Sequence, residues 1–137
     1  MITGFRVEPN RQGSKARLGA GSILGKRILY VDDDEFLRRV AIRILGGAGA
    51  VCFTAGSHAQ AIEIVYREPA LALVILDFQM PDGDIGLLVD RLRVARPELL
   101  LIGSSGQDCA HDFAERGVTV FLEKPWKLDA LERAMNS

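Results

Sequence analysis

Five short apolar segments, each followed by a longer amphipathic segment, constrain the fold of this chain more than any other feature of its sequence. The segments cover residues 28–31, 51–55, 71–76, 99–102 and 118–122. Apolar runs of this length are typical of buried strands, and the stretches between them carry apolar residues at helical spacing. Strands that alternate with helices form a parallel sheet, because each right-handed crossover returns its helix to a face of that sheet. The sequence therefore predicts an α/β fold, (βα)5, with a doubly wound five-stranded parallel sheet.

Caps and breakers indicate where the helices between these strands begin and end. Gly46 and Gly47 follow the first amphipathic stretch and would end its helix. Ser57 is a suitable N-cap for the second helix, and the third stops before Pro97. The last two helices are expected at about residues 107–116 and 128–135.

The charge distribution divides the chain into two parts. Residues 1–27 carry six basic side chains against one acidic side chain, whereas the whole chain of 137 residues has a formal net charge of −1. Residues 1–25 also lack apolar periodicity, so we expect a basic, flexible tail or linker there and one domain over residues 26–137. The nearly neutral total argues against direct nucleic-acid binding.

Cysteine usage and hydropathy exclude several other classes of protein. Cys52 and Cys109 have no metal-ligand spacing, and two distant cysteines do not make a disulfide framework. No apolar run approaches the roughly 18 residues of a membrane span, and the N-terminal segment lacks the apolar centre of a secretory signal. We therefore expect a cytoplasmic protein.

Chemically distinctive residues follow four of the five predicted strands. They are Asp32 and Asp33, Asp77, Ser104, and Lys124. Ligands of open α/β sheets bind beyond the carboxyl ends of the strands, so these side chains are the first candidates for a site. Carboxylates gathered at one edge repel one another unless a cation lies among them, and hard oxygen ligands suit Mg²⁺. A hydroxyl and an ammonium beside them suit a phosphoryl group.

Four motifs give the stretch from Lys26 to Ser137 a resemblance to the receiver domain of two-component response regulators. They are ILYVDDDE, VILDFQMPDGD, LIGSSGQD and FLEKPW, and they occur in the family's order, each at the end of a strand. The resemblance implies a flavodoxin-like fold. It also implies a phospho-receiver that takes a phosphoryl group from a sensor histidine kinase or a phosphotransfer protein.

The resemblance also assigns roles to individual residues. Asp77 would be the phosphoacceptor and, with Asp33, a carboxylate ligand of Mg²⁺. The backbone carbonyl of Gln79 would be a further ligand, and Asp32 would act through a metal-bound water. Ser104 would hydrogen-bond the phosphoryl group, and Lys124 would contact first the carboxylate and then the phosphate. Phe121, three residues before Lys124, matches the aromatic residue that moves in the family's switch.

Such a domain is a signalling switch that catalyses its own phosphorylation and dephosphorylation, and it is not a turnover enzyme. Its output would be a partner-binding face for an unidentified downstream protein, and phosphorylation-dependent homodimerisation is possible in such a family. No output domain is recognisable after Met135. The sequence does not distinguish a stand-alone receiver from part of a larger regulator or hybrid kinase.

Several alternatives stay open at the level of sequence. Asp32 to Glu35 could be a solvated acidic helix start, Ser105 could replace Ser104, and Phe121 could be only a core residue. A haloacid-dehalogenase-like phosphatase also uses a strand-end aspartate with Mg²⁺, although Phe36 occupies a position where that family has Thr or Val. A degenerate receiver that never accepts phosphate is the other alternative.

Two positions depart from the family's pattern. Ile85 stands where the loop after the phosphoacceptor usually has glycine, so the third helix could start late or under strain. Gln79 lies two residues beyond Asp77, where a side chain overlooks the acyl phosphate. Because Gln can orient a water molecule but cannot ionise, we expect a moderate phosphoryl lifetime.

Overall fold

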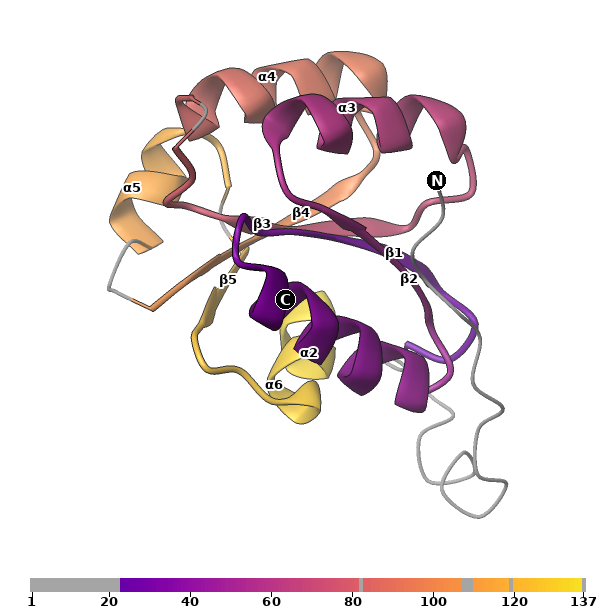
Figure 1. Ribbon diagram of the computed structural model, residues 1–137. Helices are drawn as coiled ribbons and strands as arrows, with labels where there is room; N and C mark the ends of the chain where they lie inside the picture. Colours follow the sequence, from indigo (N-terminus) through magenta and orange to yellow (C-terminus); the bar gives the residue numbers. More distant parts are fainter. Residues whose placement is uncertain (1–22, 82, 107–109, 119, 137) are drawn as a thin grey trace.

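The computed structural model describes residues 23–81, 83–106, 110–118 and 120–136, and these form a parallel five-stranded sheet between two layers of helices (Figure 1). The strands are β1 (Arg27–Val31), β2 (Val51–Ala55), β3 (Leu73–Asp77), β4 (Leu100–Ser105) and β5 (Val120–Glu123). The helices are α2 (Glu35–Gly47), α3 (His58–Arg67), α4 (Ile85–Ala95), α5 (Ala110–Glu115) and α6 (Leu128–Met135). The predicted fold class is confirmed.

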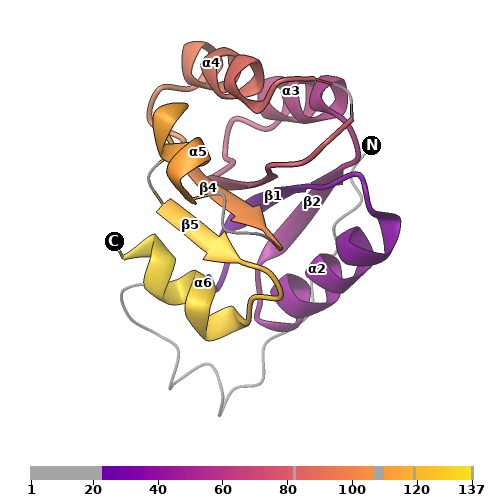
Figure 2. The same cartoon turned by 90° about the vertical axis from the view of Figure 1, so that its left-hand side faces the viewer.

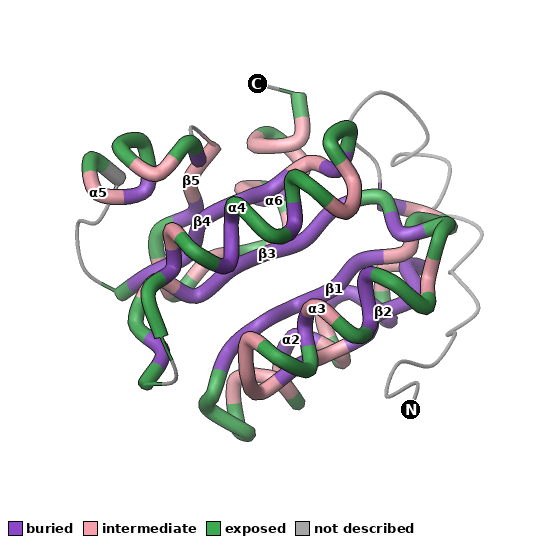
Figure 3. The backbone as a smooth tube through the Cα atoms, turned by 90° about the horizontal axis from the view of Figure 1, so that it is seen from above, coloured by how far each residue is buried: buried purple, intermediate pink, exposed green. Residues whose placement is uncertain are grey.

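The strand order β2-β1-β3-β4-β5 places the switch in winding direction between β1 and β3. Helices α3, α4 and α5 cover one face of the sheet, and α2 and α6 cover the other (Figures 1 and 2). Strands with both faces covered must be apolar throughout, and Figure 3 shows them buried along most of their length while the helices are exposed on their outer sides. Beyond the carboxyl ends of β1 and β3 a ligand site is expected.

Local signals in the sequence explain where the helices begin. The side chain of Asp34 accepts hydrogen bonds from the backbone N–H groups of Phe36 and Leu37, and Ser57 accepts one from Gln60. Asp84 does the same for Gly86 at the start of α4. These N-caps satisfy backbone donors that a first helical turn leaves open. The predicted N-cap Ser57 is therefore confirmed.

The bounds of β3 and β4 differ from the sequence-based expectations. Leu71 and Ala72 precede β3 rather than opening it, and the backbone N–H of Ala72 donates to Arg27 in the first contact of that strand with β1. Strand β4 continues to Ser105, so both serines belong to the strand and not to a turn after it. The expected start of α5 at residue 107 lies outside the described residues.

The start of α4 shows none of the strain that Ile85 led us to expect. Ile85 is the first residue of the helix, it is buried, and Asp84 caps it from an extended conformation. Among the described residues, only glycines have positive φ angles. With Asp84 as the N-cap, the helix begins at Ile85 without a backbone conformation that only glycine could adopt.

The expected tail, residues 1–25, lies largely outside the described residues, but its last three residues belong to the folded domain. Ile23 is fully buried among the apolar side chains between the sheet and helices α2 and α6. The backbone N–H of Gly25 donates to the carbonyl of Gly49. Within the described residues, the packing of the domain therefore includes residues that precede the expected boundary at residue 26.

Candidate functional site

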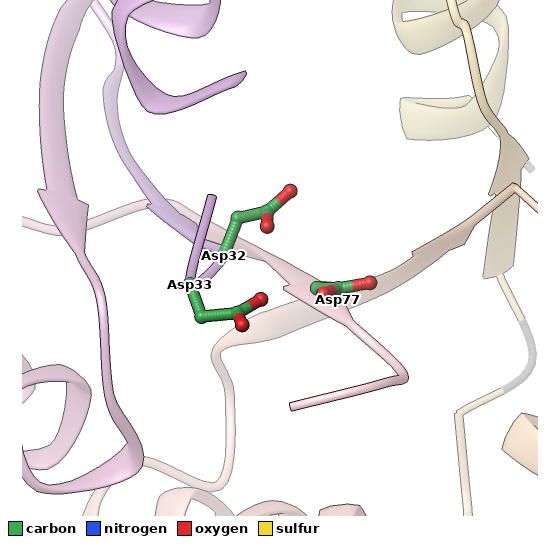
Figure 4. A group of neighbouring side chains, drawn as sticks. All are labelled: Asp32, Asp33 and Asp77. Atoms are coloured by element: carbon green, nitrogen blue, oxygen red, sulfur yellow. The ribbon is translucent and has the colours of Figure 1, made fainter. Parts of the chain in front are cut away.

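Three carboxylates meet at the carboxyl ends of β1 and β3. Asp32 and Asp33 directly follow β1, and Asp77 is the last residue of β3. One oxygen from each lies within 4.8 Å of the others, and Figure 4 shows the carboxylate of Asp33 turned toward Asp77. Asp32 and Asp77 are buried, whereas Asp33 is exposed, so the group is open to solvent on the side of Asp33. Hard oxygen ligands in this arrangement suit a divalent cation.

Lys124 brings a positive charge to the same point from the end of β5. Its ammonium lies 2.8 Å from Oδ2 of Asp32 and 3.2 Å from Oδ1 of Asp77, and its side chain is mostly buried. The site thus holds three carboxylates and one ammonium, and its formal charge with all four groups ionised is −2. A divalent cation would neutralise that charge.

The pKa values of these groups reflect both burial and pairing. Burial raises the pKa of Asp77, and the charge of Asp32 adds to the rise, against the opposing effects of Lys124 and of a backbone hydrogen bond from Gln79. Burial by itself would lower the pKa of Lys124, but hydrogen bonds and charges from Asp32 and Asp77 outweigh it and raise that pKa. Lys124 is therefore held as a cation beside the two carboxylates.

Ser104 completes the group from β4. It is paired in register with Asp77, so the two residues lie side by side at the edge of the sheet. Its hydroxyl is fully buried and has no hydrogen-bond partner among the described residues. A buried hydroxyl without a partner is costly, which is consistent with a position kept for an incoming acceptor oxygen. Ser105, the alternative, is paired with Glu123 instead.

Phe121 packs against the apolar cluster on the face of the sheet that α3, α4 and α5 cover. Its ring packs against Phe113 of α5 at 5.7 Å between centroids, and Phe113 packs edge to face against Phe78, which directly follows Asp77, at 4.9 Å. Phe113 also covers Gly103, where an added Cβ would lie 2.7 Å from its ring. The three rings form a continuous aromatic cluster from the residue after Asp77 to β5.

Sequence reasoning missed four residues near the site: Tyr30, Arg38, Phe78 and Phe113. The guanidinium of Arg38 on α2 donates a hydrogen bond of 2.8 Å to the backbone carbonyl of Asp32. Tyr30 donates a hydrogen bond to the Asp32 carboxylate. Its position two residues before Asp32 on one strand was a usable signal, because side chains two apart share a face. For Phe113, no local signal distinguished it from an ordinary core residue.

The side chain of Gln79 is exposed beside Asp77. The role of the Gln79 backbone carbonyl as a metal ligand stays a prediction.

No helix in the described part of the chain is both long enough and apolar enough to cross a membrane.

Comparison with known proteins identifies relatives over nearly the whole domain. Residues 28–136 match the model of the response regulator receiver domain family. The chemotaxis protein CheY of Bacillus subtilis is 32% identical over 117 residues, which cover 82% of this chain and 97% of that protein. The DNA-binding transcriptional regulator NtrC of Azospirillum brasilense is 35% identical over 117 residues, which cover 80% of this chain and 24% of the regulator.

Solved structures give the same result for the fold. The beryllofluoride-activated NtrC4 receiver domain dimer matches with a TM-score of 0.69 and 28% identity over 80% of this chain and 93% of that one. The chain spans about a quarter or less of the length of its larger curated relatives.

Proposed function

Because this chain belongs to the response regulator receiver domain family, we propose that it is a phosphorylation switch whose phosphoacceptor is Asp77. The observation that carries this proposal is the position of Asp77. Its carboxylate contacts Lys124 and lies within 4.8 Å of oxygens of Asp32 and Asp33. On the neighbouring strand, Asp77 is paired in register with Ser104, whose hydroxyl is buried. A carboxylate in these surroundings is a nucleophile flanked by groups that suit a phosphoryl group.

The residues fit a magnesium ion. Asp33 and Asp77 would be its carboxylate ligands with the backbone carbonyl of Gln79, and Asp32 would act through a metal-bound water. The support comes from the donor atoms within 4.8 Å and from the formal −2 charge that Lys124 leaves uncompensated. When bound, Mg²⁺ would offset negative charge on the transferring group.

The reaction forms one bond and breaks one bond. An oxygen of Asp77 attacks the phosphorus of a phosphohistidine, the P–N bond breaks, and its electron pair goes to the imidazole nitrogen, which takes a proton. The ammonium of Lys124, 3.2 Å from Asp77, balances charge that develops on the phosphoryl oxygens. The hydroxyl of Ser104 donates to one of those oxygens, and hydrolysis of the acyl phosphate later restores the carboxylate.

The donor would be a sensor histidine kinase or a phosphotransfer protein, because such proteins carry phosphohistidine. We place this exchange in the cytoplasm, where phosphohistidine is made from ATP. Phe121 and the aromatic cluster would report the phosphorylated state to a downstream protein or to a second copy of the chain. The NtrC4 receiver domain is described as a dimer in its beryllofluoride-activated form, which supports the second possibility.

The direct test is mass spectrometry of the intact protein and its peptides after incubation with acetyl phosphate and Mg²⁺. We expect one phosphoryl group on the peptide that contains Asp77, and none in the Asp77→Asn variant. A wild-type protein that takes no phosphoryl group would indicate a degenerate receiver. Sustained turnover of a phosphate ester that needs Asp32 but not Asp77 would instead indicate a phosphatase.

A further inference from the structure

Tyr30 carries a polar group into a part of the core that is otherwise apolar. It lies in the middle of β1 and is 3% exposed, among the side chains that pack between the sheet and helices α2 and α6. Its neighbours on the same face include Ile28 and Ile75. A buried hydroxyl costs free energy unless it is hydrogen-bonded, so the hydroxyl of Tyr30 needs a partner that an aliphatic residue would not need.

That partner is the Asp32 carboxylate. The hydroxyl of Tyr30 donates to Oδ2 of Asp32 at 2.7 Å, and the ammonium of Lys124 lies 2.8 Å from the same oxygen. The backbone N–H of Asp34 donates to the other oxygen at 3.0 Å. A carboxylate oxygen accepts hydrogen bonds, so the hydroxyl of Tyr30 is the donor in this contact.

These contacts distinguish Asp32 from the two neighbouring carboxylates. Asp33 is exposed. Asp77 contacts the ammonium of Lys124, but that ammonium lies closer to Asp32. We propose that Tyr30 is a positioning residue that fixes the orientation of Asp32 toward the magnesium site, and this inference rests on the function proposed above. Partners that hydrogen-bond a metal-binding carboxylate orient it and change metal affinity although they never touch the metal.

The surroundings of Tyr30 limit what could replace its hydroxyl. Its ring borders a cavity of about 310 Å³ between α2 and the segment after β5. Most of the residues that line this cavity are apolar: Leu37, Val40, Ala41, Ile44 and Pro125, together with the ring of Trp126. In the described part of the chain, Tyr30 and Lys124 are the lining side chains that donate to the Asp32 carboxylate, and a water molecule could enter. Loss of the Tyr30 hydroxyl should therefore weaken the binding of Mg²⁺ only moderately.

The ring and the hydroxyl of Tyr30 can be tested separately. Tyr30→Phe keeps the ring and its packing near Trp126, whose centroid lies 6.2 Å away, and removes only the donor. The matched control is Tyr66→Phe, because Tyr66 is the other tyrosine of the chain and is 69% exposed on α3. We expect calorimetric titration with Mg²⁺ to give a Kd about tenfold weaker for Tyr30→Phe and an unchanged Kd for Tyr66→Phe.

A double-mutant cycle with Asp32→Ala, which removes both acceptor oxygens, tests whether Tyr30 acts through Asp32. In the Asp32→Ala background, Tyr30→Phe should change the Kd for Mg²⁺ by less than about twofold. An equal tenfold loss in that background would overturn the inference, because Tyr30 would then act by another route.

The same titration separates the failure of this inference from the failure of the proposed function. If the wild-type chain binds Mg²⁺ and Tyr30→Phe binds it equally well, Tyr30 has only a packing role and the inference alone is wrong. If the wild-type chain binds no Mg²⁺, the proposed function fails and the role of Tyr30 fails with it.

Discussion

The two faces of the sheet carry different kinds of side chain at the carboxyl end of the strands. Under α2 and α6, the apolar packing is interrupted by Tyr30, Asp32 and Lys124, which form a buried network of charges and hydrogen bonds. Under α3, α4 and α5, the packing stays apolar and contains the cluster of Phe78, Phe113 and Phe121. The buried network of Tyr30, Asp32 and Lys124 thus lies on one face, and Phe121, the proposed readout, packs on the other.

Strand β4 connects the two faces. Ser104 is paired with Asp77, and the preceding residue, Gly103, is covered by the ring of Phe113. Successive residues of a strand point to opposite faces. A shift of Ser104 toward a phosphoryl group would therefore move Gly103 relative to Phe113, and the aromatic cluster would respond. A signal from Asp77 to Phe121 would therefore cross the sheet, and β4 offers a short route.

Among the variants considered, we expect the largest effect from the loss of a ring on the apolar face, and the property affected is stability. Phe113→Ala removes a fully buried ring that contacts both Phe78 and Phe121, and we expect it to lower the free energy of unfolding by about 3–5 kcal/mol. Urea unfolding measures this change. The matched control is Phe36→Ala, because Phe36 is 70% exposed and should cost about 0.5 kcal/mol or less. Equal costs at the two positions would contradict the described packing.

On the polar face, we expect the next largest effect from Lys124. Lys124→Met removes the cation that lies beside Asp32 and Asp77, so phosphorylation by acetyl phosphate should slow by about 100-fold or more. Lys127→Met is the control, because Lys127 is an exposed lysine three residues away and should react at the wild-type rate. Equal rates for the two variants would exclude a role for Lys124 in charge balance.

The smallest effect should appear in the pH dependence of stability. The pKa of Asp77 is raised in the folded protein, so its contribution to stability is complete at acidic pH and is lost as the pH rises through that pKa. Asp77→Asn should therefore stabilise the metal-free protein near pH 7, by about 1 kcal/mol, and should not do so at pH values below the ordinary pKa of an aspartate. Unfolding curves at both pH values measure the difference. A variant that is less stable than the wild type near pH 7 would contradict the sign.

The sequence predicted the architecture and the strand-end residues because both depend on local patterns. Apolar runs that stop at Asp32, Asp77 and Glu123 indicate strands, and parallel strands bring their ends to one edge. The limits of β4 were not predicted, because glycine and serine suggest a turn, whereas pairing with β3 and β5 extends the strand to Ser105.

Contacts between distant segments could not be read from the sequence. The approach of Lys124 to Asp32 follows from the fold, but the position of Phe113 over Gly103 depends on side-chain packing across elements. The bond from Tyr30 to Asp32 is local, and the alternation of side chains along β1 could have indicated it. The strain expected at Ile85 is absent, and the N-cap residue Asp84 directly before it was a local signal for a regular helix start.

Amide NMR spectra of the isotope-labelled chain, recorded with and without beryllofluoride and Mg²⁺, test the connection between the two faces most directly. Beryllofluoride imitates a phosphoryl group, so we expect the signals of Asp77 and Ser104 to shift on one face and those of Phe113 and Phe121 to shift on the other. The Asp77→Asn variant should show none of the beryllofluoride-dependent shifts. Shifts confined to the strand ends, with Phe113 and Phe121 unchanged, would contradict a signal that crosses the sheet.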